Sequence, residues 1–213
     1  MSAAVGSTSP ETTTFGHLTI QFDDRVLRPR DWTAQQSAWA RDLLAEAPAG
    51  PVLEICAGVG HIGLLAVAGT SREIVLVDLN PVACHYARIN AEAAGHPVEV
   101  REGAMDEVLH DSETYALVIA DPPWVPSDRT GQFPEDPLIA IDGGSDGMGL
   151  AWTCVDVVAG HLADGGSALL QLGNLEQVGQ LERHLADDPG LGLRVLEARE
   201  HDDRGVVVRL VRA

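Results

Sequence analysis

The sequence has no long apolar run, few cysteines and few basic residues. None of its apolar runs approaches the ~20 residues that a membrane-spanning helix needs. The first residues also lack the basic and apolar parts of a secretory signal peptide, so we expect a cytoplasmic protein. Its three cysteines, Cys56, Cys84 and Cys154, are scattered through apolar segments. This spacing predicts neither a disulfide framework nor a metal site.

Basic residues are too few to balance the acidic ones. The chain has 14 Lys and Arg against 32 Asp and Glu, which gives a formal net charge of -18. Such a field repels a polyphosphate backbone. Nucleic acid is therefore a disfavoured partner, and a protein or small molecule is favoured.

The length of 213 residues, with 45% hydrophobic residues, is enough for one domain with its own core. Residues 1–14 are small, polar and without period, which predicts a disordered tail. We expect a single domain over residues 15–213. Within it, residues 15–50 form an N-terminal segment with a helix at about 33–47, and residues 51–213 form the core.

Short apolar runs alternate with longer helical patterns along the core. Strands are predicted at residues 51–55, 74–77, 98–100, 115–120, 167–172, 193–198 and 206–211. Helices are predicted at residues 61–68, 81–94, 148–162 and 175–185. This order predicts an α/β, Rossmann-like fold: a mostly parallel seven-stranded sheet with helices on both faces and an antiparallel C-terminal hairpin. The aperiodic segment 121–147 is long enough to be a functional loop.

A glycine-rich turn follows the first predicted core strand. Gly58, Gly60 and Gly63 satisfy the pattern G-x-G-x-x-G, and Asp78 lies 20 residues after Gly58 at the end of the next strand. Glycines let a backbone approach a nucleoside closely, and a carboxylate there accepts hydrogen bonds from ribose hydroxyls. An NAD-dependent oxidoreductase would use the same features, so this motif alone leaves the cofactor open.

Glu54 lies near the end of that strand, among apolar residues. A carboxylate there is costly to bury without a dedicated partner. A cofactor ammonium, or amide donors of the glycine turn, could be that partner; the alternative is a carboxylate that only orders the turn. We interpret His61 as a helix-start residue and Cys56 as a packing residue.

The segment Asp121-Pro122-Pro123-Trp124 directly follows the predicted strand at 115–120 and is the most specific motif in the chain. Two prolines stiffen the backbone and remove two amide donors, which leaves carbonyls free to accept hydrogen bonds. Together with the Asp121 carboxylate, they can bind both hydrogens of a planar amino or amide group while Trp124 stacks on its face. This geometry favours a nitrogen nucleophile.

These motifs resemble those of class I amino-methyltransferases, whose acceptor motif reads Asp or Asn, Pro, Pro and an aromatic residue. Residues 26–33, Val-Leu-Arg-Pro-Arg-Asp-Trp-Thr, are similar to the Val-Leu-x-Pro-Arg-x-x-Thr segment of HemK-type release-factor glutamine methyltransferases. Residues 140–147, Ala-Ile-Asp-Gly-Gly-Ser-Asp-Gly, resemble their Ala-Leu-x-Gly-Gly-x-Asp-Gly. The similarity covers about residues 15–172 and thus the catalytic domain only.

The resemblance implies S-adenosylmethionine as the cofactor and suggests roles for the matching residues. The implied cofactor-binding residues are Glu54, Cys56, Ala57, Gly58, Gly60, Asp78, Leu79, Ala104, Met105 and Asp121. The implied catalytic residues are Asp121, Pro122 and Trp124, and the implied substrate-binding residues are Arg30, Thr33, Pro123 and Trp124.

Several positions depart from the HemK-type pattern. Asp121 replaces an Asn, Trp124 replaces the usual Tyr, Cys56 replaces the first glycine, and Ala104 stands where a Gly-Asp pair would face the adenine. A helical N-terminal domain, with which the bacterial enzymes hold release factor, also has no counterpart here. We therefore expect either a partner protein that supplies recognition or a smaller substrate.

The sequence thus predicts an S-adenosylmethionine-dependent N-methyltransferase acting on an amide or amino nitrogen of a protein, such as a HemK-type glutamine, or of a small molecule. Asp121 also fits an adenine N6-type nucleic-acid methyltransferase. An NAD-dependent oxidoreductase would leave residues 121–124 without a role. A non-catalytic cofactor-binding module is the remaining alternative.

Overall fold

The computed structural model describes residues 9–201 and 204–213 and contains a seven-stranded sheet of order β5-β4-β3-β6-β7-β9-β8. The first five of these strands run parallel, and β9 pairs antiparallel with both β7 and β8. The strands are β3 (Val52–Ile55), β4 (Ile74–Asp78), β5 (Val98–Glu102), β6 (Tyr115–Ala120), β7 (Leu162–Leu172), β8 (Leu193–Glu200) and β9 (Val206–Arg212). The predicted sheet is confirmed. The predicted turn at 202–205 lies partly outside the described residues.

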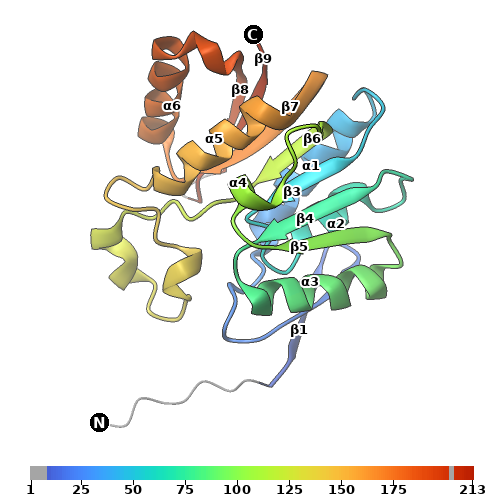
Figure 1. Cartoon of the computed structure of the whole chain (residues 1–213). Helices are drawn as coiled ribbons and strands as arrows, with labels where there is room; N and C mark the ends of the chain where they lie inside the picture. The colour runs from blue at the N-terminus through green and yellow to red at the C-terminus, as the bar shows by residue number, and fades with distance from the viewer. Residues whose placement is uncertain (1–8, 202–203) are drawn as a thin grey trace.

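Three helices cover each face of the sheet (Figure 1). One apolar cluster joins the sheet to α1 (Ala34–Leu44), α2 (His61–Val67) and α3 (Pro81–Ala94). The other joins the opposite face to α4 (Met105–Val108), α5 (Gly149–His161) and α6 (Leu175–Asp187). None of the helices in the described part of the chain is long and apolar enough to span a bilayer.

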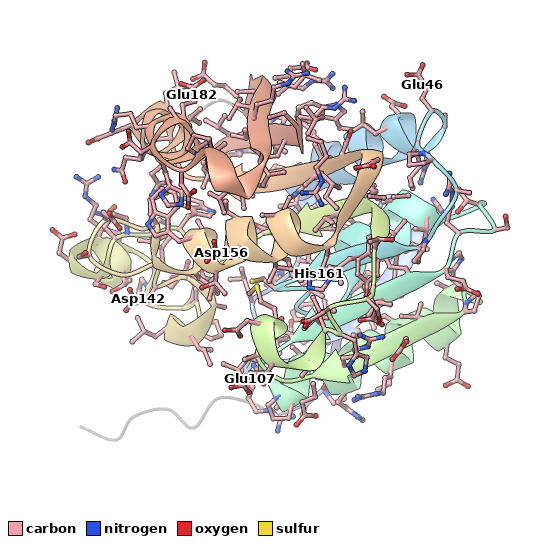
Figure 2. The ribbon with its side chains drawn as sticks, turned by 45° about the horizontal axis from the view of Figure 1, so that its top comes forward. Glu46, Glu107, Asp142, Asp156, His161 and Glu182 are labelled. Atoms are coloured by element: carbon pink, nitrogen blue, oxygen red, sulfur yellow. The ribbon has the colours of Figure 1, made fainter. Side chains whose placement is uncertain are left out.

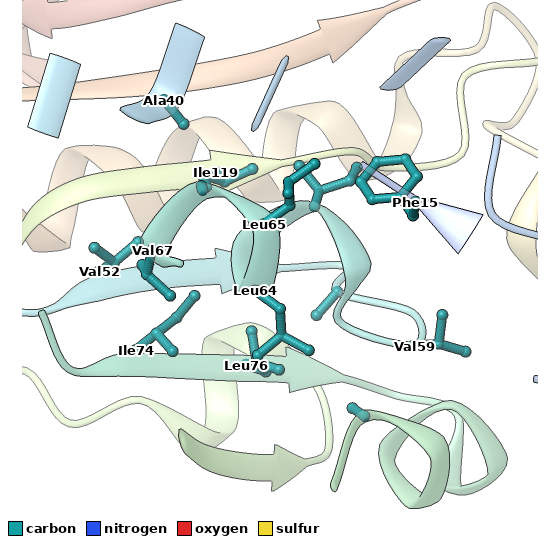
Figure 3. Packing of buried hydrophobic residues seen from close by; sticks show 14 of the residues in the cluster. Phe15, Ala40, Val52, Val59, Leu64, Leu65, Val67, Ile74, Leu76 and Ile119 are labelled. Carbon is teal, nitrogen blue, oxygen red and sulfur yellow. The ribbon is translucent and has the colours of Figure 1, made fainter. Parts of the chain in front are cut away.

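Helix α2 illustrates how apolar side chains exclude water from the face of the sheet that α1, α2 and α3 cover. Its residues Leu64 and Val67 lie over Ile74 and Leu76 of β4 (Figure 3). Residues on alternate positions of a strand point to the same face, and these strands are apolar on both faces as buried parallel strands are. Both faces of the sheet are therefore covered by apolar side chains. Polar groups can gather at the carboxyl ends of the strands instead.

The predicted disordered tail is wrong for residues 11–14. These form most of β1 (Glu11–Phe15), which pairs antiparallel with β2 (Leu18–Phe22). Three successive threonines favour a strand, and Phe15 anchors it because only 1% of its side chain is exposed. The prediction for residues 1–8 lies outside the described residues.

Polar contacts fix this hairpin to α3. The Asn90 side chain accepts a hydrogen bond from the Gln21 amide at 2.7 Å and donates to the Gln21 carbonyl at 3.0 Å. Beyond β2, the Tyr86 hydroxyl donates to the fully buried Asp23 at 2.9 Å. The N-terminal segment is thus part of the folded structure.

The acidic residues responsible for the net charge are spread over several elements. Glu46 follows α1, Glu107 lies in α4 and Glu182 in α6, well apart from one another (Figure 2). Such dispersed carboxylates form a solvated surface. Other carboxylates lie at the ends of β3, β4 and β6, where Glu54 is buried and Asp78 and Asp121 are half-buried.

Candidate active site

The candidate site lies where the carboxyl ends of β3, β4 and β6 meet. After β3 the chain builds β4 and β5 on one side, whereas β6 and β7 lie on the other. Such a switch in strand order leaves a crevice in which open α/β sheets bind their ligands. Glu54, Asp78 and Asp121 all lie at this edge, as the sequence predicts.

Asp78 holds the glycine turn. Its Oδ2 accepts a hydrogen bond from the Gly58 amide at 2.6 Å, and its Oδ1 accepts one from Asn80 at 2.8 Å. Gly58 has φ +54° and a Cβ there would meet nothing within 4 Å, so there is open space beside this turn. Burial raises the pKa of Asp78, although these backbone donors oppose the shift.

Glu54 is only 2% exposed and accepts a single hydrogen bond in the described structure, from the Gly63 amide to Oε2 at 3.1 Å. Gly63 has to be glycine because a Cβ would overlap this carboxylate. Burial raises the pKa of Glu54 well above its ordinary value, and the negative charges of Asp121 and Asp78 raise it further. Glu54 therefore contacts the first turn of α2 through Gly63, and a role for Glu54 in cofactor binding stays a prediction.

Asp121 directly follows β6 and has no hydrogen bond to its side chain within the described residues. Burial raises the pKa of its carboxyl to about 7. Pro122 and Pro123 are buried, and no group in the described part of the chain donates to the Pro122 carbonyl. Two acceptors without protein donors thus stand together at the end of this strand.

The glycine-rich segment 143–147 packs against the loop formed by residues 121–125, which is called the acceptor loop below. Val125 donates to the Ile141 carbonyl at 3.0 Å, and Gly143 donates back to the Val125 carbonyl at 2.8 Å. A Cβ on Gly143 would meet the Pro123 carbonyl at 2.7 Å. The segment that resembles the HemK-type sequence is therefore a backbone support for the acceptor loop.

Trp124 rests against the end of β7 and the start of α6. A Cβ on Gly173 would meet the Trp124 ring at 2.5 Å, so the ring lies over a residue without a side chain. The Gln177 amide donates to the Trp124 carbonyl at 3.1 Å. Sequence reasoning missed Gln177, because one glutamine on an amphipathic helix gives no signal of being buried.

The predicted substrate residues Arg30 and Thr33 have contacts within the protein. Arg30 pairs with both oxygens of Asp136 at 2.5 and 2.6 Å, which ties the N-terminal segment to the loop after Trp124. Thr33 is 3% exposed and donates to the Arg30 carbonyl at 2.9 Å. Its hydroxyl also lies 3.5 Å from Nε2 of His61. A substrate contact for either residue stays a prediction.

His61 begins α2, as expected, and is neutral. Its ring meets Phe15 edge-on at a centroid distance of 4.7 Å. Burial lowers the pKa of His61 to about 4. The imidazole therefore carries no charge near pH 7.

The other predicted cofactor residues differ in exposure and surroundings. Cys56 has φ +54°, in the left-handed region that favours glycine, the residue that the HemK-type pattern has at this position. Hydrogen bonding with Cys154 and burial raise the pKa of the Cys56 thiol, which stays neutral. Leu79 is 62% exposed after β4, whereas Ala57 and Met105 are buried and Ala104 caps α4. Met105 lies in the apolar core against Cys154.

Comparison with known proteins finds a match to the Methyltransferase small domain family over residues 37–136. The chain is 33% identical over 163 residues to a release factor glutamine methyltransferase of Deinococcus radiodurans, covering 74% of this chain and 58% of that protein. It is 29% identical over 171 residues to a ribosomal protein uL3 glutamine methyltransferase of Bordetella pertussis, covering 75% and 56%. The chain thus spans less than two thirds of the length of these relatives.

Another relative has a different type of substrate in its name. A 4-amino-L-phenylalanine/4-methylamino-L-phenylalanine methyltransferase of Streptomyces pristinaespiralis is 31% identical over 130 residues, covering 59% of this chain and 44% of that protein. All three relatives are methyltransferases, so the comparisons decide against the oxidoreductase that the glycine turn left open.

Solved structures show the same fold. A ribosomal protein L11 methylase from Lactobacillus delbrueckii subsp. bulgaricus superposes with a TM-score of 0.64 at 13% identity, covering 90% of this chain and 83% of that one. The human methyltransferase 10 domain containing protein gives 0.66 at 14% identity, covering 92% and 88%. The family match, the relatives and this fold thus agree that the chain is similar to the HemK-like class I methyltransferases.

Proposed function

We propose that residues 15–213 act as one methyltransferase domain that transfers a methyl group from S-adenosylmethionine to the side-chain amide nitrogen of a protein glutamine. The observation that carries the proposal is the pair of acceptors at the end of β6. The Asp121 carboxyl and the Pro122 carbonyl have no protein donor in the described structure and stand beside the turn held by Asp78. The names of the glutamine methyltransferase relatives support the substrate class.

The residues present fit the cofactor. Burial and the negative charges of Asp121 and Asp78 oppose the ionisation of Glu54, and a cationic ligand would offset this cost. The left-handed Gly58 with open space above it lets an adenosine ribose approach Asp78. Bound there, S-adenosylmethionine would supply an electrophilic methyl group on a positively charged sulfur.

The protein's contribution to the reaction is mainly orientation. The Pro122 carbonyl and Asp121 accept the two hydrogens of the amide nitrogen and so direct its lone pair, while Trp124 covers the planar group and excludes water. With the cofactor bound, the oriented nitrogen would accept its methyl group and lose one proton to solvent, and the demethylated cofactor would be released. Such positioning is worth several orders of magnitude in rate.

A protonated Asp121 carboxyl can take the place of the asparagine that the HemK-type pattern has at this position. Because burial raises the pKa of Asp121 to about 7, the group keeps its proton below that pH. A protonated carboxyl offers one donor and one acceptor, as an asparagine amide does. It can therefore accept from the substrate amide nitrogen and donate to the substrate carbonyl.

This assignment predicts a pH dependence. With a glutamine acceptor, kcat/KM should fall as pH rises through about 7, since Asp121 loses the proton it donates. The fall should approach tenfold per pH unit above the pKa. The Asp121→Asn variant should match or exceed the parent enzyme and keep its activity flat across pH 6 to 9. A falling limb that persists in the amide variant would remove Asp121 as its cause.

A second candidate acceptor is an aromatic or aliphatic amine. It is favoured by the Asp at position 121 and by the relative named for 4-amino-L-phenylalanine. An amine has no neighbouring carbonyl, so an ionised acceptor suits it better. On such a substrate kcat/KM should rise through pH 7, and Asp121→Asn should be slower than the parent.

The cofactor half of the proposal is tested by Asp78→Ala. Two ribose hydroxyls would lose a charged acceptor, so the free energy of S-adenosylmethionine binding should weaken by about 1–3 kcal/mol in calorimetry. Glu46→Ala, which removes an exposed carboxylate far from the site, is the control (Figure 2). An unchanged dissociation constant in the Asp78 variant would exclude this residue from the cofactor site.

The whole proposal is tested by adding purified protein and methyl-labelled S-adenosylmethionine to a lysate. Label is expected in the protein fraction, from which acid hydrolysis should release it as methylamine, the product of a methylated amide. Label mainly in nucleic acid or in small molecules would contradict the glutamine assignment. Binding of NAD in place of S-adenosylmethionine would contradict the cofactor assignment as well.

A further inference from the structure

Gln177 lies outside the segment that matches the family model and yet contacts the acceptor loop. It stands in the first turn of α6 and is 2% exposed. Its Nε2 donates to the Trp124 carbonyl at 3.1 Å and to the Asp146 carbonyl at 3.0 Å. Its Oε1 accepts from the Gly173 amide at 2.6 Å. One side chain thus joins β7, the acceptor loop and the returning end of that loop.

The packing of α6 does not require an amide at this position. The other buried positions of the helix are Val178, Leu181 and Leu185, which pack in the apolar core. A buried polar side chain is costly unless its groups are all bonded, and here both amide hydrogens and the oxygen have partners. The three bonds therefore specify where the loop lies, because a displaced loop would leave the amide unsatisfied.

The groups that Gln177 joins are those that place the Trp124 ring. Gly173, which donates to Gln177, is also the residue over which the ring lies. The Trp124 carbonyl, which Gln177 binds, is the oxygen that a Cβ on Gly147 would overlap. Gln177 on α6 therefore fixes both the direction of the Trp124 backbone and the position of the Trp124 ring.

We propose that Gln177 is a positioning residue for the methyl acceptor: it fixes the Trp124 wall of the acceptor site from α6 without touching the substrate or the cofactor. The acceptor role of Trp124 rests on the function proposed above. The effect of Gln177 should appear in steps that involve the acceptor and be absent from cofactor binding, which uses the ends of β3 and β4 on the other side of β6.

The test is the variant Gln177→Glu. Glutamate has the same length and keeps the oxygen that accepts from the Gly173 amide. Its second oxygen cannot donate to the Trp124 and Asp146 carbonyls, as the glutamine nitrogen does. The matched control is Gln171→Glu. Gln171 is also fully buried and donates to a backbone carbonyl, that of Leu172 at 2.7 Å, but makes no hydrogen bond to the acceptor loop among the described residues. Both variants introduce the same group into a buried site near the end of β7.

We expect Gln177→Glu to raise the acceptor KM by about tenfold or more and to lower kcat, with the dissociation constant of S-adenosylmethionine changed less than twofold. Gln171→Glu should leave the acceptor KM within twofold of the parent. Equal changes in both variants, or a parallel loss of cofactor affinity, would overturn the proposal. If Gln177→Glu does not fold, Gln177→Met, which is as long and uncharged, is measured in its place with the same expected result.

Tryptophan emission tests the positioning role of Gln177 independently of the proposed function. The chain has four tryptophans, so the Trp124 emission is taken as the difference between each protein and its Trp124→Phe counterpart. Gln177→Glu should shift or quench this difference spectrum, and Gln171→Glu should leave it unchanged. An unaltered spectrum would overturn the positioning role even if a glutamine acceptor is found. A failure to methylate any acceptor would contradict the proposed function while this spectrum still tests Gln177.

Discussion

Replacing Asp121 by alanine is expected to lower turnover by about 10²-fold or more while leaving the affinity for S-adenosylmethionine nearly intact. In the proposed function the lost hydrogen bond would direct the nitrogen lone pair, whereas the methyl donor would be held mainly by groups at the ends of β3 and β4. Single-turnover rates at saturating cofactor, together with calorimetric cofactor affinity, measure the two effects separately.

Trp124→Ala is the companion variant, since it should raise the acceptor KM through loss of stacking. Asp106→Ala is the control, because this acidic side chain is exposed in α4. Parental turnover in the Asp121→Ala protein would eliminate the Asp-Pro-Pro-Trp loop as the acceptor site. It would also remove the main structural support for N-methylation.

The order of elements could be predicted because the central strands of this sheet are buried on both faces. Short, mainly apolar runs such as those of β4 and β6, separated by amphipathic helices, leave few other arrangements. Once the strands are parallel, polar residues that follow neighbouring strands must meet at one edge. Asp78 and Asp121 stand at the ends of the two strands that flank β3, so they lie at the same edge of the sheet.

The hairpin β1–β2 could not be predicted because its stability comes from distant residues. The sequence Glu-Thr-Thr-Thr-Phe looks like the continuation of a polar tail. Its strand forms because Phe15 is buried in the core with α2, and because Asn90, far away in the chain, holds the second strand. Tertiary contacts thus override local composition.

The support of the acceptor loop was missed for a similar reason. The glycines at 143–147 resemble a known pattern, but their purpose is visible only when the Pro123 and Trp124 carbonyls lie against them. Gln177 gives no sequence signal because a glutamine on a helix is ordinarily exposed. A sequence motif identifies residues that contact a ligand more readily than it identifies the residues that hold those ligand-binding residues in place.

Gly147→Ala is expected to destabilise the fold and disable the acceptor loop. Gly147 has φ +78°, and its Cβ would overlap the carbonyl oxygen of Trp124, a backbone atom that cannot simply rotate away. The left-handed backbone alone should cost about 1–2 kcal/mol with alanine. The overlap should add about 1–3 kcal/mol, because either this segment or the Trp124 backbone must shift.

Gly165→Ala separates these two costs. Gly165 has nearly the same φ of +75°, but a Cβ there would meet nothing within 4 Å. The free energy of unfolding, measured by chemical denaturation, should therefore fall by ~1–2 kcal/mol in Gly165→Ala and by ~2–5 kcal/mol in Gly147→Ala. The folded fraction of Gly147→Ala should still bind S-adenosylmethionine, since the ends of β3 and β4 are untouched, but it should have lost most of its turnover. If the two alanine variants lose equal stability and keep equal activity, then segment 143–147 does not hold the acceptor loop, and the close approach of Gly147 to Trp124 has no bearing on methyl transfer.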